Sequence, residues 1–307
     1  MPKILANSIN MHYQTRGSGD DVVLLHGVTS SLAMWYNGFI PSLEQEFRTT
    51  AYDLRGHGLT DLTPTGYTSY ALSEDLKCFL DALGIEKTLL VGHSYGGAIA
   101  THFALRFPER VRGVVMLDTG FACLRYLRII REWSGWKRRN RILPSMTLSR
   151  FLEVDDKQDI TDFLRTMLTV PRVSGFRKGQ SGLTERQRRL IDETTIGSEF
   201  RDVAGMTEDL LLTIRTPMLA LYGETSPYKK MAAHLANRLP ECRQEVIPAA
   251  GHFESIWNPG LVTGKIIPFL RDPEGYVRSA QPANPGLVKT ANNWLPRLWM
   301  SKFLSRW

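Results

Sequence analysis

Apolar segments of strand length alternate with helical segments along the first 120 residues of the chain. Residues 22–25 are continuously apolar, and residues 88–91 and 111–117 form further strand-like segments. Between these strands a helical stretch is expected over about residues 31–46, and residues 70–83 carry apolar side chains at helical spacing. A continuous apolar run indicates a parallel strand that is covered on both faces. Strands that alternate with helices in this way imply right-handed crossovers, so the chain is predicted to adopt an α/β fold with a mostly parallel sheet.

This alternation stops near residue 121 and resumes at residues 217–222. The segment between them is basic, helical in character and without a continuous apolar strand. We expect it to form a helical cap over the carboxyl edge of the sheet. Beyond residue 272 we expect a loop as far as residue 296, followed by a basic, aromatic amphipathic stretch. The predicted units are a core of residues 1–120 and 213–272, a cap of residues 121–212, and a C-terminal extension of residues 273–307.

The overall composition indicates a soluble intracellular protein with enough apolar residues for a large core. Of the 307 residues 43% are hydrophobic, and no stretch of about 18 apolar residues occurs. Residues 1–7 lack the apolar region of a signal peptide. Cys78, Cys123 and Cys242 lie far apart and lack metal-ligand spacing, so neither a disulfide framework nor a zinc site is expected. A cytoplasmic location is therefore predicted.

Positive charge is concentrated in two segments. Residues 125–150 contain eight basic residues and one acid, and residues 275–307 contain five basic residues and no acid. These segments are either solvated helix faces or surfaces for an anionic substrate, an acidic carrier protein or an anionic membrane, the last implying a peripheral membrane location. No nucleic-acid recognition motif accompanies the charge, so nucleic acid is not an expected partner.

The motif that carries chemistry is Gly92-His93-Ser94-Tyr95-Gly96, which lies directly after a predicted strand and before a predicted helix. A turn this tight leaves space only for hydrogen at the positions two before and two after the serine. Ser94 would then project from a strained corner where a base can reach its hydroxyl. The helix N-terminus beneath it favours developing negative charge. We therefore predict Ser94 to be a nucleophile rather than a residue of an ordinary turn.

Two further segments complete the predicted machinery. His26-Gly27-Val28 follows the strand at residues 22–25, and the main-chain N–H groups of Val28 and Tyr95 are the expected oxyanion donors. His26 itself is expected to be structural. His252 follows a late strand in Pro248-Ala249-Ala250-Gly251-His252 and is the predicted general base. The remaining histidines are interpreted as structural.

These motifs, in this order, resemble the cap-bearing branch of the α/β-hydrolase superfamily across about residues 8–272. The resemblance implies an eight-stranded, mostly parallel sheet of order 1-2-4-3-5-6-7-8, and it implies no metal or organic cofactor. A serine at residue 94, in place of the aspartate of the related haloalkane dehalogenases and epoxide hydrolases, implies an acyl-enzyme rather than an alkyl-enzyme ester. The shared motifs are His26-Gly27, Trp35, Asp53-Leu54-Arg55-Gly56-His57-Gly58, the Ser94 turn and Ala250-Gly251-His252.

The acid that would orient His252 departs from the family pattern. Relatives carry Gly-x-x-Asp after strand seven, whereas this chain has Gly223-Glu224-Thr225-Ser226. Asp118, at the end of strand six, is the preferred replacement, because some family members carry their acid there. Glu224 is the alternative, and a Ser–His dyad or a degraded site is the third possibility. Asp118 could also be no more than a turn-capping residue.

The predicted function is a serine hydrolase that cleaves an ester, lactone or thioester with a hydrophobic acyl or aromatic group. The alternatives are a thioesterase or acyltransferase that acts on an acidic carrier protein, and a relative that only binds its ligand. The hydrophobic character of the substrate is inferred from the apolar and aromatic side chains of the predicted cap, namely Phe121, Trp133, Trp136, Phe151, Phe163 and Phe176.

Overall fold

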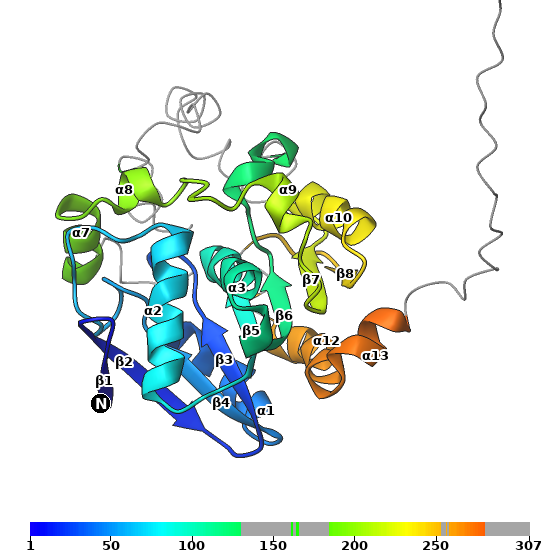
Figure 1. The fold of residues 1–307 in the computed structure, drawn as a ribbon, viewed down its shortest axis with the longest axis horizontal. Helices are drawn as coiled ribbons and strands as arrows, with labels where there is room; N and C mark the ends of the chain where they lie inside the picture. Colours follow the sequence, from blue (N-terminus) through cyan, green and yellow to red (C-terminus); the bar gives the residue numbers. More distant parts are fainter. Residues whose placement is uncertain (130–160, 162–163, 166–183, 253–255, 257, 280–307) are drawn as a thin grey trace, which may run out of the picture.

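A computed structural model of the chain describes residues 1–129, 161, 164–165, 184–252, 256 and 258–279. Its centre is an eight-stranded sheet of order β1-β2-β4-β3-β5-β6-β7-β8, seen in Figure 1. The pairs from β4 to β8 are parallel, and β1 and β2 add an antiparallel edge. The α/β fold and its strand order agree with the sequence prediction. The strands are β1 Lys3–Ala6, β2 Ile9–Arg16, β3 Asp20–Leu25, β4 Phe47–Tyr52, β5 Thr88–His93, β6 Val111–Leu117, β7 Met218–Gly223 and β8 Cys242–Ile247.

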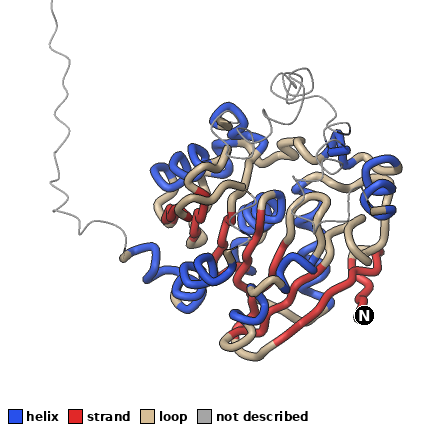
Figure 2. The backbone as a smooth tube through the Cα atoms, turned by 180° about the vertical axis from the view of Figure 1, so that it is seen from behind, coloured by secondary structure: helices blue, strands red, loops and turns tan. Residues whose placement is uncertain are grey.

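Helices cover both faces of this sheet, as Figure 2 shows from behind. The cluster on one face contains the buried side chains of α2 (Ser69–Ala82), α3 (Tyr95–Arg106) and α10 (Lys229–Arg238). The cluster on the other face contains those of the remaining core helices. These are the 3-10 helix η1 (Leu32–Tyr36), α1 (Phe39–Leu43), α12 (Pro259–Arg271) and α13 (Pro273–Arg278).

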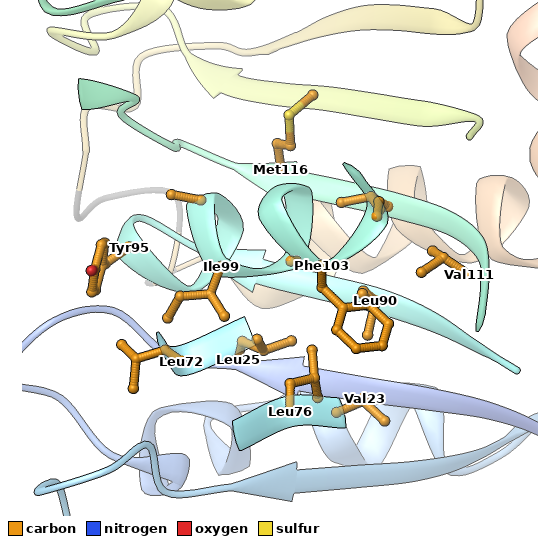
Figure 3. Close-up of a cluster of buried hydrophobic side chains, with 14 of the residues drawn as sticks. Val23, Leu25, Leu72, Leu76, Leu90, Tyr95, Ile99, Phe103, Val111 and Met116 are labelled. Carbon is orange, nitrogen blue, oxygen red and sulfur yellow. The ribbon is translucent and has the colours of Figure 1, made fainter. Parts of the chain in front are cut away.

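Strand β3 shows why its apolar run is continuous. Val23 and Leu25 belong to one cluster, whereas Val22 and Leu24 belong to the other. All four side chains are fully buried, because successive strand residues point to opposite faces and both faces carry helices. Figure 3 shows the first cluster, in which Ile99 and Phe103 of α3 lie over the sheet.

Two predicted elements differ from the structure. The helical stretch expected over residues 31–46 is divided into η1 and α1 by Gly38, which has a φ of 99°. A Cβ at Gly38 would lie 2.7 Å from Cγ of Pro259, so α12 packs against this break.

The prediction of a loop directly after residue 272 was wrong, because α13 occupies Pro273–Arg278. The Asp272 side chain accepts a hydrogen bond from the Gly275 N–H at 2.9 Å, and Pro273 opens the helix with a favourable φ. Val277 is buried against the core. Residues 273–278 therefore pack with the core, whereas the sequence prediction assigned them to the separate C-terminal extension.

The described parts of residues 121–212 contain helices joined by turns and no strand, in keeping with the expected helical character. They comprise η3 (Ala122–Leu127), α7 (Glu185–Asp192), α8 (Ile196–Glu199) and α9 (Glu208–Leu211). Leu190 and Ile196 pack on Tyr67 of the core, and the Glu199 carboxylate accepts a hydrogen bond from the Gly66 N–H at 3.0 Å. The cap aromatics Trp133, Trp136, Phe151, Phe163 and Phe176, most of the first basic segment, and residues 280–307 lie outside the described residues.

Within the described residues, no helix combines the length and the apolar character needed to cross a membrane.

Candidate active site

Ser94 occupies a strained turn between β5 and α3. Its φ and ψ are 53° and −118°, in a region that L-residues rarely adopt. The flanking glycines are required by close backbone contacts. A Cβ on Gly92 would lie 2.4 Å from the carbonyl of Gly96, and a Cβ on Gly96 would lie 2.2 Å from the carbonyl oxygen of Leu25. The local sequence therefore forces this turn, and Ser94 opens onto a cavity.

Three side chains from separate strand ends form one hydrogen-bonded chain. Ser94 Oγ lies 3.1 Å from Nε2 of His252, and Nδ1 of His252 lies 2.9 Å from Oδ1 of Asp118. Ser94 follows β5, Asp118 follows β6 and His252 follows β8. Because an ionised carboxylate only accepts, Nδ1 of neutral His252 carries the proton and Nε2 accepts from the Ser94 hydroxyl.

The Asp118 carboxylate is fully buried and accepts three hydrogen bonds. Besides His252, its donors are the Ser226 hydroxyl at 2.5 Å and the Gly223 N–H at 2.8 Å. Ser226 stands where relatives are expected to carry the acid, and here it donates to an acid on the neighbouring strand. In the sequence, Ser226 was noted only as a serine in place of the expected aspartate. No local signal shows which carboxylate accepts the hydrogen bond from its hydroxyl.

Glu224, the alternative acid, has a different partner. Its Oε2 accepts a hydrogen bond from the Ala249 N–H at 2.9 Å, in the turn that leads from β8 to His252. Its side chain is exposed. The structure therefore brings Asp118, and not Glu224, to the Nδ1 atom of His252.

His93 packs beside His252, although its sequence context predicted only a structural role. The two rings stack with centroids 5.1 Å apart, and Nε2 of His93 donates to the His252 carbonyl at 3.2 Å. Burial lowers the pKa of His93 to about 3. A positive charge on His252 would therefore meet a neutral ring rather than a second cation.

The loop after β3 approaches the nucleophile closely. A Cβ on Gly27 would lie 3.2 Å from Cβ of Ser94, and both Val28 and Tyr95 line the same cavity as Ser94. The next residue, Thr29, has a φ of 62°, which is unfavourable for a β-branched side chain. Its N–H donates to Nε2 of His57 at 3.0 Å, which fixes the loop despite this strain.

His26 and His57 are neutral structural connectors. Nε2 of His26 accepts from the Leu54 N–H at 3.0 Å, and its Nδ1 donates to the Gly27 carbonyl at 2.8 Å. Nδ1 of His57 donates to the Arg55 carbonyl at 2.7 Å. Burial lowers the pKa of His26, and it lowers the pKa of His57 to about 3. Each ring therefore needs one donating and one accepting nitrogen, which only the neutral form provides.

These histidines predict that stability falls as the solution is acidified. Between pH 6.5 and about 3, the unfolded chain protonates His57 and His93 while the native protein does not. The free energy of unfolding should then decrease by up to about 1.4 kcal/mol per pH unit for each such residue. Urea unfolding between pH 7.5 and 4.5 measures this slope. The His57→Gln variant should show a shallower dependence, and an equal slope would contradict the assignment.

A cavity of about 1130 Å³ opens over this site. Ser94 and His252 lie in its wall together with apolar side chains such as Met34, Phe121 and Phe200 and with polar and charged ones, and the exposed surface of the wall is mainly apolar. Within the part of the chain that the structure describes, no group of three or more His, Cys, Asp or Glu side chains is arranged to bind a metal ion.

The fold and the site together define the class of protein. The strand order, the strained serine turn and the histidine after β8 are those that the sequence resemblance implied. Residues 21–259 match the family described as alpha/beta hydrolase fold. The chain belongs to this family, and it is an α/β hydrolase.

Named relatives differ in chemistry and in coverage. The chain is 41% identical to epoxide hydrolase 3 of Siraitia grosvenorii over 120 residues, which are 38% of each protein. It therefore spans about two fifths of the length of that relative. It is 28% identical to the pimeloyl-[acyl-carrier protein] methyl ester esterase of Vibrio campbellii over 254 residues, which are 80% of this chain and 92% of that protein.

Solved structures share the fold. The enol-lactonase from Burkholderia xenovorans superposes with a TM-score of 0.60 at 21% identity, and the match covers 88% of this chain and 100% of that one. At this identity the likeness shows the fold alone.

Proposed function

We propose that the protein is a serine hydrolase that cleaves an ester, lactone or thioester through an acyl-enzyme. The observation that carries this proposal is the hydrogen-bonded chain from Ser94 through His252 to Asp118, with distances of 3.1 and 2.9 Å. In this hydrogen-bonded series the Ser94 hydroxyl faces Nε2 of His252, and the buried Asp118 carboxylate holds the other ring nitrogen, Nδ1. That arrangement activates a serine for attack on a carbonyl.

In the proposed reaction, Ser94 Oγ attacks the acyl carbonyl while its proton passes to Nε2 of His252. Asp118 stabilises the resulting imidazolium across a buried hydrogen bond. The main-chain N–H groups of Val28 and Tyr95 donate to the oxyanion, and the α3 N-terminus adds its dipole. The protonated His252 then donates its proton to the leaving group. Water, deprotonated by His252, attacks the acyl-enzyme and releases the acid.

The nucleophile separates this chain from its epoxide hydrolase relatives. In the covalent mechanism of epoxide hydrolases a carboxylate forms an alkyl-enzyme ester, whereas residue 94 is a serine. The proposed chemistry is therefore acyl transfer to water rather than the opening of an epoxide.

The cavity supports a hydrophobic substrate. Its volume of about 1130 Å³ exceeds that of many small-ligand sites. The exposed surface of its wall is mainly apolar, with contributions from both core and cap. We propose that residues 121–212 act as the cap that selects the substrate. We also propose a cytoplasmic location, in keeping with three cysteines that are all free in the structure.

A second candidate is hydrolysis of an acyl group that is attached to an acidic carrier protein. The relative that aligns over 80% of this chain is named an esterase of a carrier-bound methyl ester, and the basic segment that begins at Arg125 would suit an acidic partner. Comparing free and carrier-bound forms of one acyl ester at two salt concentrations distinguishes the candidates. A preference for the carrier-bound form that disappears at high salt would favour the second.

The test of the proposed function is direct. A fluorophosphonate probe should label the wild-type protein at Ser94, because only an activated serine reacts, and 4-nitrophenyl octanoate should be hydrolysed. A protein that only binds its ligand would remain unlabelled. Absence of both labelling and ester hydrolysis would overturn the proposal.

A further inference from the structure

Arg186 on α7 carries a charge into the wall of the cavity that contains Ser94. Its Nη2 donates to the main-chain carbonyl of Thr60. Its Nε is buried, and no described residue accepts a hydrogen bond from it. A buried N–H without an acceptor is costly, and more so when it belongs to a cation. The side chain therefore carries a buried N–H donor without an acceptor among the described residues, in the wall of the cavity that also contains Ser94.

No acid of the described chain forms an ion pair with Arg186. The two acids whose charges act on it, Asp53 and Asp61, are engaged elsewhere. Asp53 accepts from the His12 ring and from two main-chain N–H groups, and Asp61 accepts from the main chain and side chain of Asn10. Burial lowers the pKa of Arg186, because the nearby negative charges do not offset the loss of solvation of the guanidinium.

The backbone around Arg186 is held firmly against the loop after β3. Thr184 caps α7 and forms a reciprocal pair of hydrogen bonds with Gln187. Nε2 of Gln187 also donates to the Thr29 carbonyl at 2.8 Å, one residue from the proposed oxyanion donor Val28. A rigid helix start thus holds the guanidinium at a defined position in the wall of the cavity.

Arg186 differs from the other cations of the wall. Arg125, Arg128 and Arg201 also line the cavity, and Nη1 of Arg201 is likewise buried without a hydrogen-bond acceptor among the described residues. Each of these three residues has a further interaction partner, however. The inference therefore depends on Arg186 alone, which has one main-chain carbonyl as its partner.

We propose that Arg186 binds a carboxylate at the end of the substrate that is not cleaved. This inference rests on the proposed function and narrows it, since the substrate becomes an ester of an acyl chain with a carboxylate at its far end. The apolar wall would hold the chain, and the guanidinium would bind the carboxylate through charge-assisted hydrogen bonds. A planar anion with two acceptor oxygens suits a guanidinium that already uses one nitrogen on Thr60.

The test compares two substrates of equal chain length, the 4-nitrophenyl monoester of suberic acid and 4-nitrophenyl octanoate. The wild-type protein should favour the monoester in kcat/KM. In Arg186→Gln the ratio of the two kcat/KM values should fall at least tenfold, because a charge-assisted pair is lost. Arg188→Gln is the matched control, since Arg188 lies on the same helix, is exposed and pairs with Glu185. This control should leave the ratio unchanged.

Three outcomes would overturn the inference. The first is a wild-type protein without preference for the monoester. The second is an equal loss of kcat/KM on both substrates in Arg186→Gln, which would show that the residue only supports the Thr60 loop. The third is a fall in the kcat/KM ratio in Arg188→Gln as large as that in Arg186→Gln. If the wild type hydrolyses neither ester, the proposed function fails separately. Suberate and octanoate are then compared as ligands by thermal shift, where stabilisation by suberate that depends on Arg186 would support the carboxylate site, and its absence would reject it.

Discussion

Ser94→Ala should abolish ester hydrolysis while the protein remains folded. The substitution removes one hydroxyl that faces the cavity, so little packing is lost. The strained backbone at residue 94 has to be adopted by alanine as it is by serine. Turnover should fall by roughly 10⁴- to 10⁶-fold, and only binding and the oxyanion donors would sustain the residual rate.

The measurement is steady-state hydrolysis of 4-nitrophenyl octanoate together with labelling by the fluorophosphonate probe. Thermal unfolding serves as the control for folding, and the midpoint should shift by no more than a few degrees. Turnover of the alanine variant close to that of the wild type, with retained labelling, would remove Ser94 as the nucleophile.

Asp118→Asn should reduce kcat by several orders of magnitude, roughly 10⁴-fold. The carboxylate accepts from Nδ1 of His252 at 2.9 Å in a fully buried position. An amide there carries no charge to stabilise the imidazolium. Its NH₂ group can instead face Nδ1, which favours the tautomer with the proton on Nε2 and blocks transfer from Ser94. KM should change much less than kcat, because Asp118 does not touch the substrate.

Two neighbouring residues provide the controls for this variant. Glu224→Gln should have a mild effect, since its carboxylate accepts from the Ala249 N–H and not from His252. Ser226→Ala should be intermediate, because one of three hydrogen bonds to the buried Asp118 carboxylate is lost. A severe effect of Glu224→Gln beside a mild effect of Asp118→Asn would transfer the acid role to Glu224.

The strand pattern and the serine turn were predictable because their causes are local. Val22 and Leu24 are buried on one face of β3, and Val23 and Leu25 are buried on the other. A continuous apolar run in the sequence indicates a strand that is covered on both faces in this way. The start of α13 was missed although its signals, Asp272 and Pro273, are also local. The short helix follows the last predicted core element, where the apolar pattern is weak.

The site was predictable only in part. The pairing of Asp118 with His252 joins residues 134 positions apart, and it was one of several alternatives in the sequence. Ser226 was visible as a departure from the family pattern, but its hydrogen bond to Asp118 depends on how β6 and β7 align. Nothing in the sequence pointed to Arg186. Its proposed role depends on its place in the cavity wall and on the absence of an ion pair with any described acid, and both are properties of the tertiary structure.

The sequence by itself determined the α/β fold and the geometry of the serine turn. Gly92 and Gly96 leave no space for side chains, so steric contacts within five residues and one neighbouring strand require that conformation. Tertiary structure alone decided which carboxylate meets His252 and which cation faces the cavity. Those choices depend on the relative positions of the ends of β6, β7 and β8 and of helix α7, which are set by packing between segments far apart in the chain.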